Sequence, residues 1–426
     1  MSDYDVQYIR EQFPSIKKKL AGLPVAYLDG PGGTQVPKRV IDKITEYLVE
    51  TNANEGGAFE TSVKTDKIME EARVICSEFL GCKAHEVAFG SSSTTNSFML
   101  AFALMKDILP GDEIIVTDLD HLCNRSPWIQ LQDAGAIIKS VRVNVEEMKL
   151  DFDDYKSKLS PRTRLVALNY ASNAVGTITD VKKYIELAHE VGAITVVDAV
   201  HYAAHKPIDV KEINTDILIC SAYKFFGPHL GVVYIRDSLF DKLKTIKVDA
   251  DDLLEVPHKF QTGTPCFENI YGTAEAIKFI ADAGEMFDHD GDKKSESQLT
   301  LREKIITGMN TFDEYEEKLA FYLRSKLYKM PKIKIYGPQE GSERTSTVSF
   351  TIDKINSDLV AKHLGSKGIY AWAGHFYAKT LVNEVLNLQK DGGLLRVGVS
   401  PYNTMQDIDR LLEEVSILAA VPLPGV

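Results

Sequence analysis

Two ionisable residues each follow an apolar run that predicts a buried strand. Asp198 ends the first run, Ile194–Val197, and Lys224 comes shortly after the second, Asp216–Cys220, within the segment SAYKFFG. A carboxylate at the end of an apolar run is costly to bury unless a cationic group meets it. A lysine among aromatic residues is partly desolvated, which lowers its pKa and makes its amine a nucleophile. The pair therefore predicts covalent amine chemistry beside a buried anion.

Pyridoxal 5'-phosphate is a ligand that would use both residues. Its aldehyde takes a lysine as a Schiff base, and its pyridinium nitrogen needs an acidic partner. The alternative is an ordinary strand–helix–strand unit in which Asp198 is incidental and Lys224 is a surface residue. The choice between a cofactor site and an ordinary strand–helix–strand unit depends on the other reactive residues and on the elements that position them.

A turn rich in small hydroxyl residues lies between an expected strand, Glu86–Phe89, and a strongly apolar helix. The turn reads GSSSTTNS, and FMLAFALM follows it. Such a turn offers free N–H groups and hydroxyls at the positive end of a helix, which can hold a phosphate. Ser92, Ser93 and Thr94 are therefore candidate phosphate ligands. The alternative is that Ser92 or Ser93 only caps the helix, because every helix start needs a cap.

Strands and helices alternate through the first half of the chain, which predicts a mostly parallel α/β sheet covered by helices. In such sheets, ligands bind at the carboxyl ends of the strands. Polar candidates gather at those ends: Ser92–Thr94, His121, Asn173, Asp198, His201 and Ser221. The seven strands are expected at Glu86–Phe89, Glu113–Thr117, Ile137–Val143, Leu165–Tyr170, Ile194–Val197, Asp216–Cys220 and Gly231–Ile235.

A second alternating region begins at Pro331 and predicts a smaller C-terminal α+β domain. We expect an N-terminal arm (1–25) that joins the small domain, a large domain (26–285) and the small domain itself (286–426). Helices are also expected at Pro37–Asn54, Arg125–Ala134 and Thr273–Ala283, and one strand at Ile369–Trp372. The Gly- and Pro-rich segment GPGGTQVP is either a simple turn or a loop at the edge of a substrate site.

Bulk composition narrows the class of protein. The chain has 426 residues, of which 44% are hydrophobic, so a large core is available. Its formal net charge of −12 argues against nucleic-acid and anionic-membrane partners. The five cysteines form no CxxC pair, which gives no support to a metal site and suits a reducing compartment. We find no apolar run long enough for a membrane span and no signal-peptide pattern, so a cytoplasmic location is expected.

Taken together, the motifs from YLDGPGG to RVGVSPYNT resemble those of fold-type I pyridoxal-phosphate enzymes. More narrowly, the chain resembles the class V aminotransferase family, in its cysteine desulfurase and selenocysteine lyase group. The resemblance implies that Lys224 forms the Schiff base and that Asp198 pairs with the pyridine nitrogen. It also implies that His121 stacks on the ring, and that Asn173 and His201 contact the ring's phenolic oxygen. His121 could equally be a capped loop residue.

The resemblance assigns the remaining candidates to three places. Ser93 and Thr94 match the phosphate turn, and Ser221 matches another phosphate ligand. Thr264, in QTGTP, matches a threonine supplied by a neighbouring subunit, which implies a homodimer with shared sites. Arg396 matches the arginine that holds the substrate's α-carboxylate, for which a guanidinium fork is well suited. The alternative for Arg396 is a structural salt bridge.

Departures from the family pattern bear on the reaction. Desulfurases carry a loop cysteine that attacks the substrate sulfur as a thiolate, and Tyr377 stands at that position here. Tyr223 replaces the histidine that usually precedes the lysine. Cys266 is the one cysteine that we expect close to the site. His375, Tyr377 and Asn54, the last at the break that ends the helix Pro37–Asn54, are expected on the substrate side.

These departures favour a C–S lyase that acts by β-elimination on an amino acid or its S-conjugate, because that reaction needs no enzyme thiol. Aminotransfer, true cysteine desulfuration and amino-acid epimerisation remain alternatives. A further alternative is a pyridoxal-phosphate-binding regulator of sulfur assembly that turns over no substrate.

Overall fold

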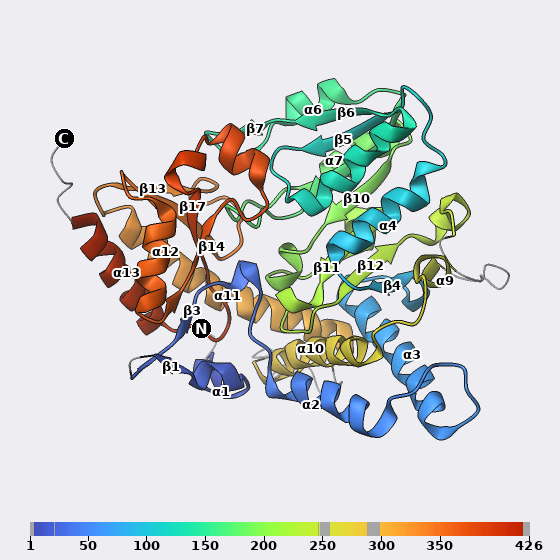
Figure 1. Ribbon diagram of the computed structural model, residues 1–426, viewed down its shortest axis with the longest axis horizontal. Helices are drawn as coiled ribbons and strands as arrows, with labels where there is room; N and C mark the ends of the chain where they lie inside the picture. The colour runs from blue at the N-terminus through green and yellow to red at the C-terminus, as the bar shows by residue number, and fades with distance from the viewer. Residues whose placement is uncertain (1–3, 21, 246, 248–255, 288–298, 421–426) are drawn as a thin grey trace.

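The computed structural model describes residues 4–20, 22–245, 247, 256–287 and 299–420. Two sheets organise the chain, one formed by residues 87–235 and one by the C-terminal region (Figure 1). No helix among the described residues is long and apolar enough to cross a membrane.

The larger sheet has seven strands, as predicted. Their spatial order is β4 (Val87–Gly90), β12 (Gly231–Ile235), β11 (Ile217–Ser221), β10 (Ile194–Asp198), β9 (Thr163–Asn169), β5 (Glu113–Thr117) and β6 (Ile137–Val141). Only β12 runs antiparallel to its neighbours, so the prediction of a mostly parallel sheet is confirmed. The predicted strand ends differ from the observed ones by up to two residues.

Helices cover both faces of this sheet, and the strands bury side chains on both. Alternate residues of one strand enter different cores: Val197 packs in the cluster under one face, and Val196 in the cluster under the other. The first face is covered by α3 (Glu60–Leu80), α7 (Val181–Glu190) and α10 (Phe267–Met286), and the second by α4 (Ser93–Met105). Burial on both faces explains why these strands read as continuous apolar runs.

The C-terminal sheet is antiparallel and smaller. Its order is β13 (Ile333–Tyr336), β14 (Thr347–Ile352), β17 (Leu394–Gly398) and β16 (Trp372–Gly374), and α11 (Leu301–Leu327), α12 (Ser357–Ser366) and α13 (Met405–Ala420) pack with it. This is the expected α+β arrangement. Near the chain start, β3 (Ala26–Tyr27) pairs in parallel with β15 (Ile369–Tyr370). The domain limits at 25/26 and 285/286 stay predictions, and residues 288–298 lie outside the described part.

Four predicted elements are wrong in part. The helix expected at Thr273–Ala283 begins earlier, at Phe267, and extends to Met286 as α10. The helix expected at Arg125–Ala134 is a single turn, α5 (Ser126–Ile129), followed by a 3-10 turn. The helix expected at Pro37–Asn54 is α2 (Lys38–Glu46) continued by a π-helical turn to Thr51. The strand expected at Ile369–Trp372 divides at Ala371, because its two halves pair with different strands, β3 and β17. Periodicity alone cannot register a change of pairing partner.

Candidate active site

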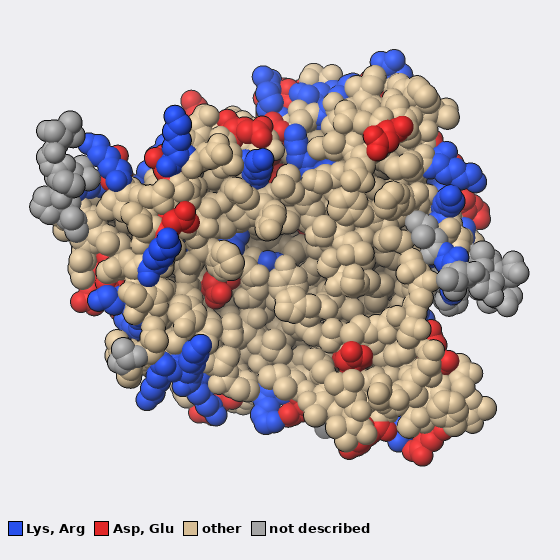
Figure 2. All heavy atoms as spheres, in the orientation of Figure 1, with Lys and Arg blue, Asp and Glu red and all other residues tan. Residues whose placement is uncertain are grey.

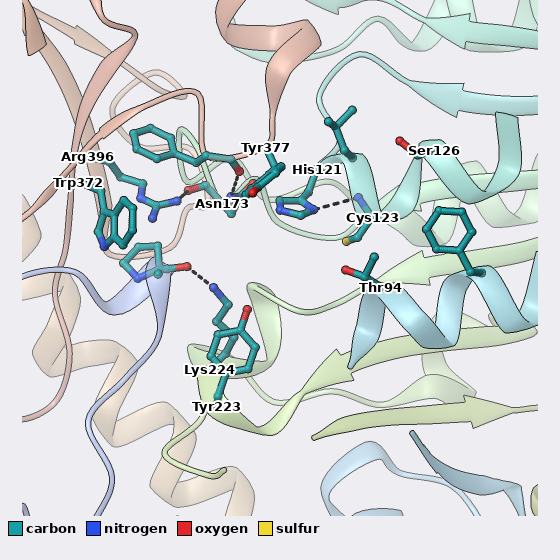
Figure 3. A pocket seen from close by; sticks show the side chains of 15 residues that line it. Thr94, His121, Cys123, Ser126, Asn173, Tyr223, Lys224, Trp372, Tyr377 and Arg396 are labelled. Carbon is teal, nitrogen blue, oxygen red and sulfur yellow. Dashed lines mark hydrogen bonds between the residues drawn. The ribbon is translucent and has the colours of Figure 1, made fainter. Parts of the chain in front are cut away.

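A cavity of about 610 Å³ lies where the strand ends of the large sheet meet the C-terminal sheet and the Gly30–Gly32 turn. A smaller cavity of about 70 Å³ shares six of its lining residues and includes Asp198 and His201. The face of the molecule shown in Figure 2 is hollowed near its centre. The larger cavity is lined by Pro31, Gly32, Thr94, Phe98, His121, Leu122, Cys123, Ser126, Asn173, Tyr223, Lys224, Trp372, Phe376, Tyr377 and Arg396 (Figure 3).

Lys224 is buried, contrary to the surface alternative. It lies on a 3-10 turn, Ala222–Lys224, directly after β11, and its ammonium donates a hydrogen bond to the carbonyl of Pro31 (Figure 3). Burial is the main cause that lowers its pKa to about 7, and the nearby Arg396 cation lowers it further. Near neutral pH, a large share of the Lys224 amine is therefore uncharged and able to act as a nucleophile or base.

Asp198 closes β10 at the floor of the smaller cavity. Its Oδ1 accepts a hydrogen bond from the Val200 N–H (2.9 Å), and its Oδ2 accepts one from the Cys123 thiol (3.3 Å). Burial raises the pKa of this carboxyl, although the two donors and the Lys224 charge oppose the rise. A cationic partner inside the cavity would therefore stabilise the Asp198 anion.

His121 is a neutral imidazole in the cavity wall. Its Nδ1 accepts a hydrogen bond from the Cys123 N–H at 3.0 Å, so the ring both faces the cavity and caps the following turn. Burial lowers its pKa to about 4, helped by the charges of Lys224 and Arg396. The two readings of this residue, ring-facing and loop-capping, are compatible.

Arg396 and Asn173 form the opposite wall. Arg396 lies on β17, and its Nη1 donates to the backbone carbonyl of Asn173 at 2.9 Å. Its guanidinium carbon is 4.0 Å from the centre of the Phe376 ring, a cation–π distance. Burial lowers the pKa of Arg396 to about 9, while the Asp29 carboxylate opposes this. The Nε atom of Arg396 has no partner among the described residues, which leaves a donor for an anion.

Several buried polar atoms around the two cavities have no hydrogen-bond partner within the described part of the chain. They include Asn169 Oδ1, Asn173 Oδ1 and His201 Nδ1, and all three residues line the smaller cavity. The opposite nitrogen of His201 is hydrogen-bonded to the hydroxyls of Thr345 (3.1 Å) and Thr347 (2.9 Å). Burial lowers the pKa of His201 well below its usual value, so this ring is neutral. Buried polar atoms are normally paired, and these point to a polar ligand.

The phosphate candidates divide into three groups. Ser92 is the cap of α4, because its hydroxyl accepts a hydrogen bond from the Thr95 N–H at 3.1 Å, so the capping alternative holds for this residue. Ser93 and Thr94, in the first turn of α4, line the smaller cavity and are free to face an anion. The Ser221 hydroxyl is buried and unpaired among the described residues, but Ser221 lines neither cavity.

Four further predicted residues lie outside both of these cavities or only at the rim of the larger one. Asn54 is not among the lining residues, and its side chain accepts a hydrogen bond from the Glu55 N–H. His375 also lies outside the lining and accepts from the Tyr377 N–H. Tyr377 does line the cavity, with 62% of its surface exposed. Thr264 lines a separate cavity of about 410 Å³, together with Cys266, so neither residue reaches the site of its own chain, and their place at a neighbour's site stays a prediction.

Sequence reasoning missed three residues of the site. Asp29 is a buried carboxyl whose pKa is raised to about 6 by burial, against the pull of Arg396. The sequence did contain a pattern that could have identified Asp29, because this residue ends an apolar run directly before the glycine turn. Asn169 ends β9 as Asp198 ends β10. Cys123, which lines both cavities, gave no signal because a single cysteine predicts nothing about its neighbours.

This arrangement is that of a fold-type I pyridoxal-phosphate enzyme. A buried lysine, an aspartate, a neutral histidine and a helix start converge on one cavity, and the unpaired polar atoms fit a polar ring carrying an anionic group. A family model described as aminotransferase class-V matches residues 26–305 and 299–411 of the chain. The chain belongs to this family, and its cofactor is pyridoxal 5'-phosphate.

Known proteins similar to the chain carry two kinds of name. An aminotransferase-like protein, FGM3, of Gibberella zeae is 31% identical over 96% of this chain and 98% of its own length. A probable cysteine desulfurase of Synechocystis is 27% identical, covering 96% and 94% of the two chains. The solved cysteine desulfurase of Thermococcus onnurineus superposes with a TM-score of 0.84 at 26% identity, covering 98% and 99%. The reaction is therefore not given by similarity alone.

Proposed function

We propose that the protein is a C–S lyase that acts on an amino acid or its S-conjugate by β-elimination. The observation that carries this proposal is the state of its thiols. A desulfurase must present a thiolate to the substrate sulfur. Tyr377 lines the cavity with an exposed side chain, and the resemblance to the family matches it to the position where desulfurases carry that cysteine.

The five cysteines, all within the described residues, are poor thiolates. Burial raises the pKa of Cys76, Cys82, Cys123 and Cys220. Cys266 is exposed, but burial of its sulfur and the Glu268 carboxylate that accepts its S–H raise its pKa to about 11. Of these, only Cys123 lines the cavity, and its thiol is held against Asp198. A reaction that needs no protein thiolate therefore fits the chain better.

The walls of the cavity assign a role to each end of an amino-acid substrate. The Arg396 guanidinium would hold the α-carboxylate, because its Nε is free and it is fixed by Asn173 and Phe376. Asn173 is fixed in turn by a 2.9 Å hydrogen bond from its Nδ2 to the Phe376 carbonyl. The substrate's α carbon would then lie between Arg396 and Lys224.

Lys224 would move the proton. When bound, pyridoxal phosphate supplies an aldehyde that takes an amine covalently and a ring that accepts electrons from the α carbon. The uncharged Lys224 amine can accept the α proton, and the neutral His121 presents an uncharged face beside it. Cleavage of the Cβ–S bond releases the thiol, and addition of one water to the remainder gives pyruvate and ammonium. Tyr223 and Tyr377 are candidate acids for the leaving sulfur.

A substrate panel tests the proposal. Purified protein with pyridoxal phosphate is incubated with L-cysteine, with cysteine S-conjugates, and with alanine plus a keto acid. Pyruvate, ammonia and thiol in equal amounts are expected, and Lys224→Ala should abolish them. Alanine with protein-bound persulfide would instead establish desulfuration, and racemised substrate would establish epimerisation. No product from any substrate, with the cofactor linked to Lys224, would favour the non-enzyme regulator.

Aminotransfer is the second candidate. It is favoured by the relative at 31% identity that is named aminotransferase-like. When bound, the cofactor would accept the amino group of the substrate in this reaction. Lys224 would again carry the α proton, and no β-substituent would leave. Exchange of the amino group between alanine and a labelled keto acid, without net pyruvate release from cysteine conjugates, would select this reaction.

A homodimer with shared sites belongs to the same proposal. Thr264 lies in a cavity apart from Lys224, as expected for a residue that serves a neighbour's site. A group of exposed apolar side chains on α2, α3 and their connection would suit the contact: Ile41, Leu48, Val49, Phe59 and Val63. Light scattering of the native protein tests the dimer, and a monomer with full activity would reject it. The cytoplasmic location is likewise proposed, and cell fractionation tests it.

A further inference from the structure

The thiol of Cys123 contacts Asp198, one of the proposed cofactor-binding residues, but has no role in the reaction proposed above. Cys123 lies on the 3-10 turn Leu122–Asn124 that follows His121 and is buried, with 6% of its surface exposed. Its Sγ is 3.3 Å from Asp198 Oδ2, within hydrogen-bond distance for sulfur. Cys123 lines both cavities, and Figure 3 shows its side chain in the wall of the larger one. The thiol and the backbone N–H of Val200 thus donate to different oxygens of one carboxylate.

The Cys123 thiol keeps its proton and therefore always acts as a hydrogen-bond donor. Burial and the adjacent Asp198 carboxylate both raise the pKa of Cys123 well above its usual value, so the proton stays on sulfur. The S–H group is a weak donor, and a carboxylate is a strong acceptor. A donor of this kind stabilises the Asp198 anion slightly and fixes the rotation of the carboxylate.

We propose that Cys123 is a positioning residue that orients Asp198 and sets its affinity for a proton, and thereby the proton affinity of the ring nitrogen that Asp198 faces. The last step rests on the proposed placement of the cofactor. Removal of the S–H donor makes the carboxylate more basic, which favours the protonated ring nitrogen. A stronger donor at the same place makes the carboxylate less basic and has the opposite effect.

Other groups also interact electrostatically with Asp198, and apart from the control residue they stay unchanged in the variants. They are the Lys224 ammonium, the Asp120 carboxyl, the Tyr223 hydroxyl and the Cys220 thiol. Cys220 is the matched control, because it is a fully buried thiol on the neighbouring strand whose sulfur has no hydrogen bond to Asp198 among the described contacts. Cys220→Ala removes a thiol of equal size near the same carboxylate.

Infrared spectroscopy of the cofactor-free protein tests the contact itself. The S–H stretch absorbs in a region that other protein groups leave clear, and a hydrogen bond to a carboxylate lowers its frequency. We expect a lowered S–H band that is lost in Cys123→Ala, kept in Cys220→Ala and shifted back in Asp198→Asn. A Cys123 band at the frequency of a free thiol overturns the proposal, whatever the cofactor does.

The ring nitrogen gives the second readout. The protein is loaded with cofactor isotopically labelled at that nitrogen, and its magnetic resonance shift reports the degree of protonation against pH. Cys123→Ala should shift the titration to higher pH, Cys123→Ser, with its stronger hydroxyl donor, to lower pH, and Cys220→Ala should leave it unchanged. A shift in the same direction for Ala and Ser would mark a packing effect and overturn the proposal. If neither the wild type nor any variant binds the cofactor at Lys224, the proposed placement of the cofactor is rejected. The infrared result on the Cys123–Asp198 hydrogen bond is independent of that outcome.

Discussion

Replacement of Arg396 by lysine tests whether the cavity recognises a carboxylate through a guanidinium fork. Lysine keeps the positive charge but has a single nitrogen at its end, so it cannot make two parallel hydrogen bonds. It also loses the planar stack on Phe376, whose ring centre is 4.0 Å from the guanidinium. In the variant, the lysine keeps a positive charge beside the Asp29 carboxyl. Any change in substrate binding can therefore be assigned to the lost guanidinium fork and not to a lost charge.

The magnitude follows from the donors that the structure leaves free. One N–H of Arg396 is taken by the Asn173 carbonyl, and Nε is unpaired in the described structure, so the fork can give two bonds to an incoming carboxylate. Lysine retains one of them. Loss of one hydrogen bond to a charged group costs about 1.5–3 kcal/mol. The expected fall in affinity, and in kcat/KM for the preferred substrate, is therefore about 10- to 150-fold.

Ligand binding provides an assay that needs no knowledge of the natural substrate. Binding of L-alanine and of ethylamine is followed in the wild type and Arg396→Lys by the change in cofactor absorbance. Alanine should bind more weakly to the variant by the factor above, and ethylamine, which lacks the carboxylate, should bind equally to both. An equal loss for the two ligands would show that Arg396 acts on the fold of the site and would refute the assignment.

Three further predictions follow from single contacts. Because the pKa of Lys224 is about 7, the rate at which apo-protein captures cofactor should rise with pH to about 7 and then level off, and a rise that continues to pH 10 would contradict this. Gly308→Ala should lower the free energy of unfolding by about 1–3 kcal/mol in denaturant titrations, because its Cβ would lie 2.1 Å from a carbonyl of α10, whereas Gly365→Ala, with open space around it, should gain about 0.5–1 kcal/mol. Cys266→Ala should leave product formation unchanged, while Tyr377→Phe should slow it if the hydroxyl protonates the leaving sulfur; loss of sulfide release only in Cys266→Ala would support desulfuration.

The sheet and the residues at its strand ends could be predicted because one physical rule governs both. A parallel strand that is buried on two faces reads as an apolar run, and the first polar residue after it marks the ligand edge. Asp198 was found in this way, and Lys224 by its aromatic surroundings. The same rule would have found Asn169, which ends β9 beside β10. The site at these strand ends is thus the predictable part of the molecule.

Contacts between distant segments were not predictable. Asp29 and Arg396 are 367 positions apart in sequence, yet each shifts the pKa of the other. The Cys123–Asp198 hydrogen bond joins a loop to a strand end 75 positions later. No periodicity encodes such pairs, since each depends on how segments far apart in the sequence pack against one another. The expectation that Cys266 is the one cysteine close to the site is also wrong, because Cys123 lines both cavities.

The charges in the cavity show why this fold needs its ligands. The pKa values of the two buried cations, Lys224 and Arg396, are both lowered, and those of the two buried carboxyls, Asp198 and Asp29, are both raised. All four groups are therefore shifted toward their neutral forms, which means that the protein's own dipoles do not fully replace water. A ring nitrogen that carries a proton would restore the anion of Asp198, and a substrate carboxylate would restore the full charge of Arg396. Binding energy and protonation are thus coupled at both ends of the cavity, and the uncharged Lys224 between them is the group left free to move a proton.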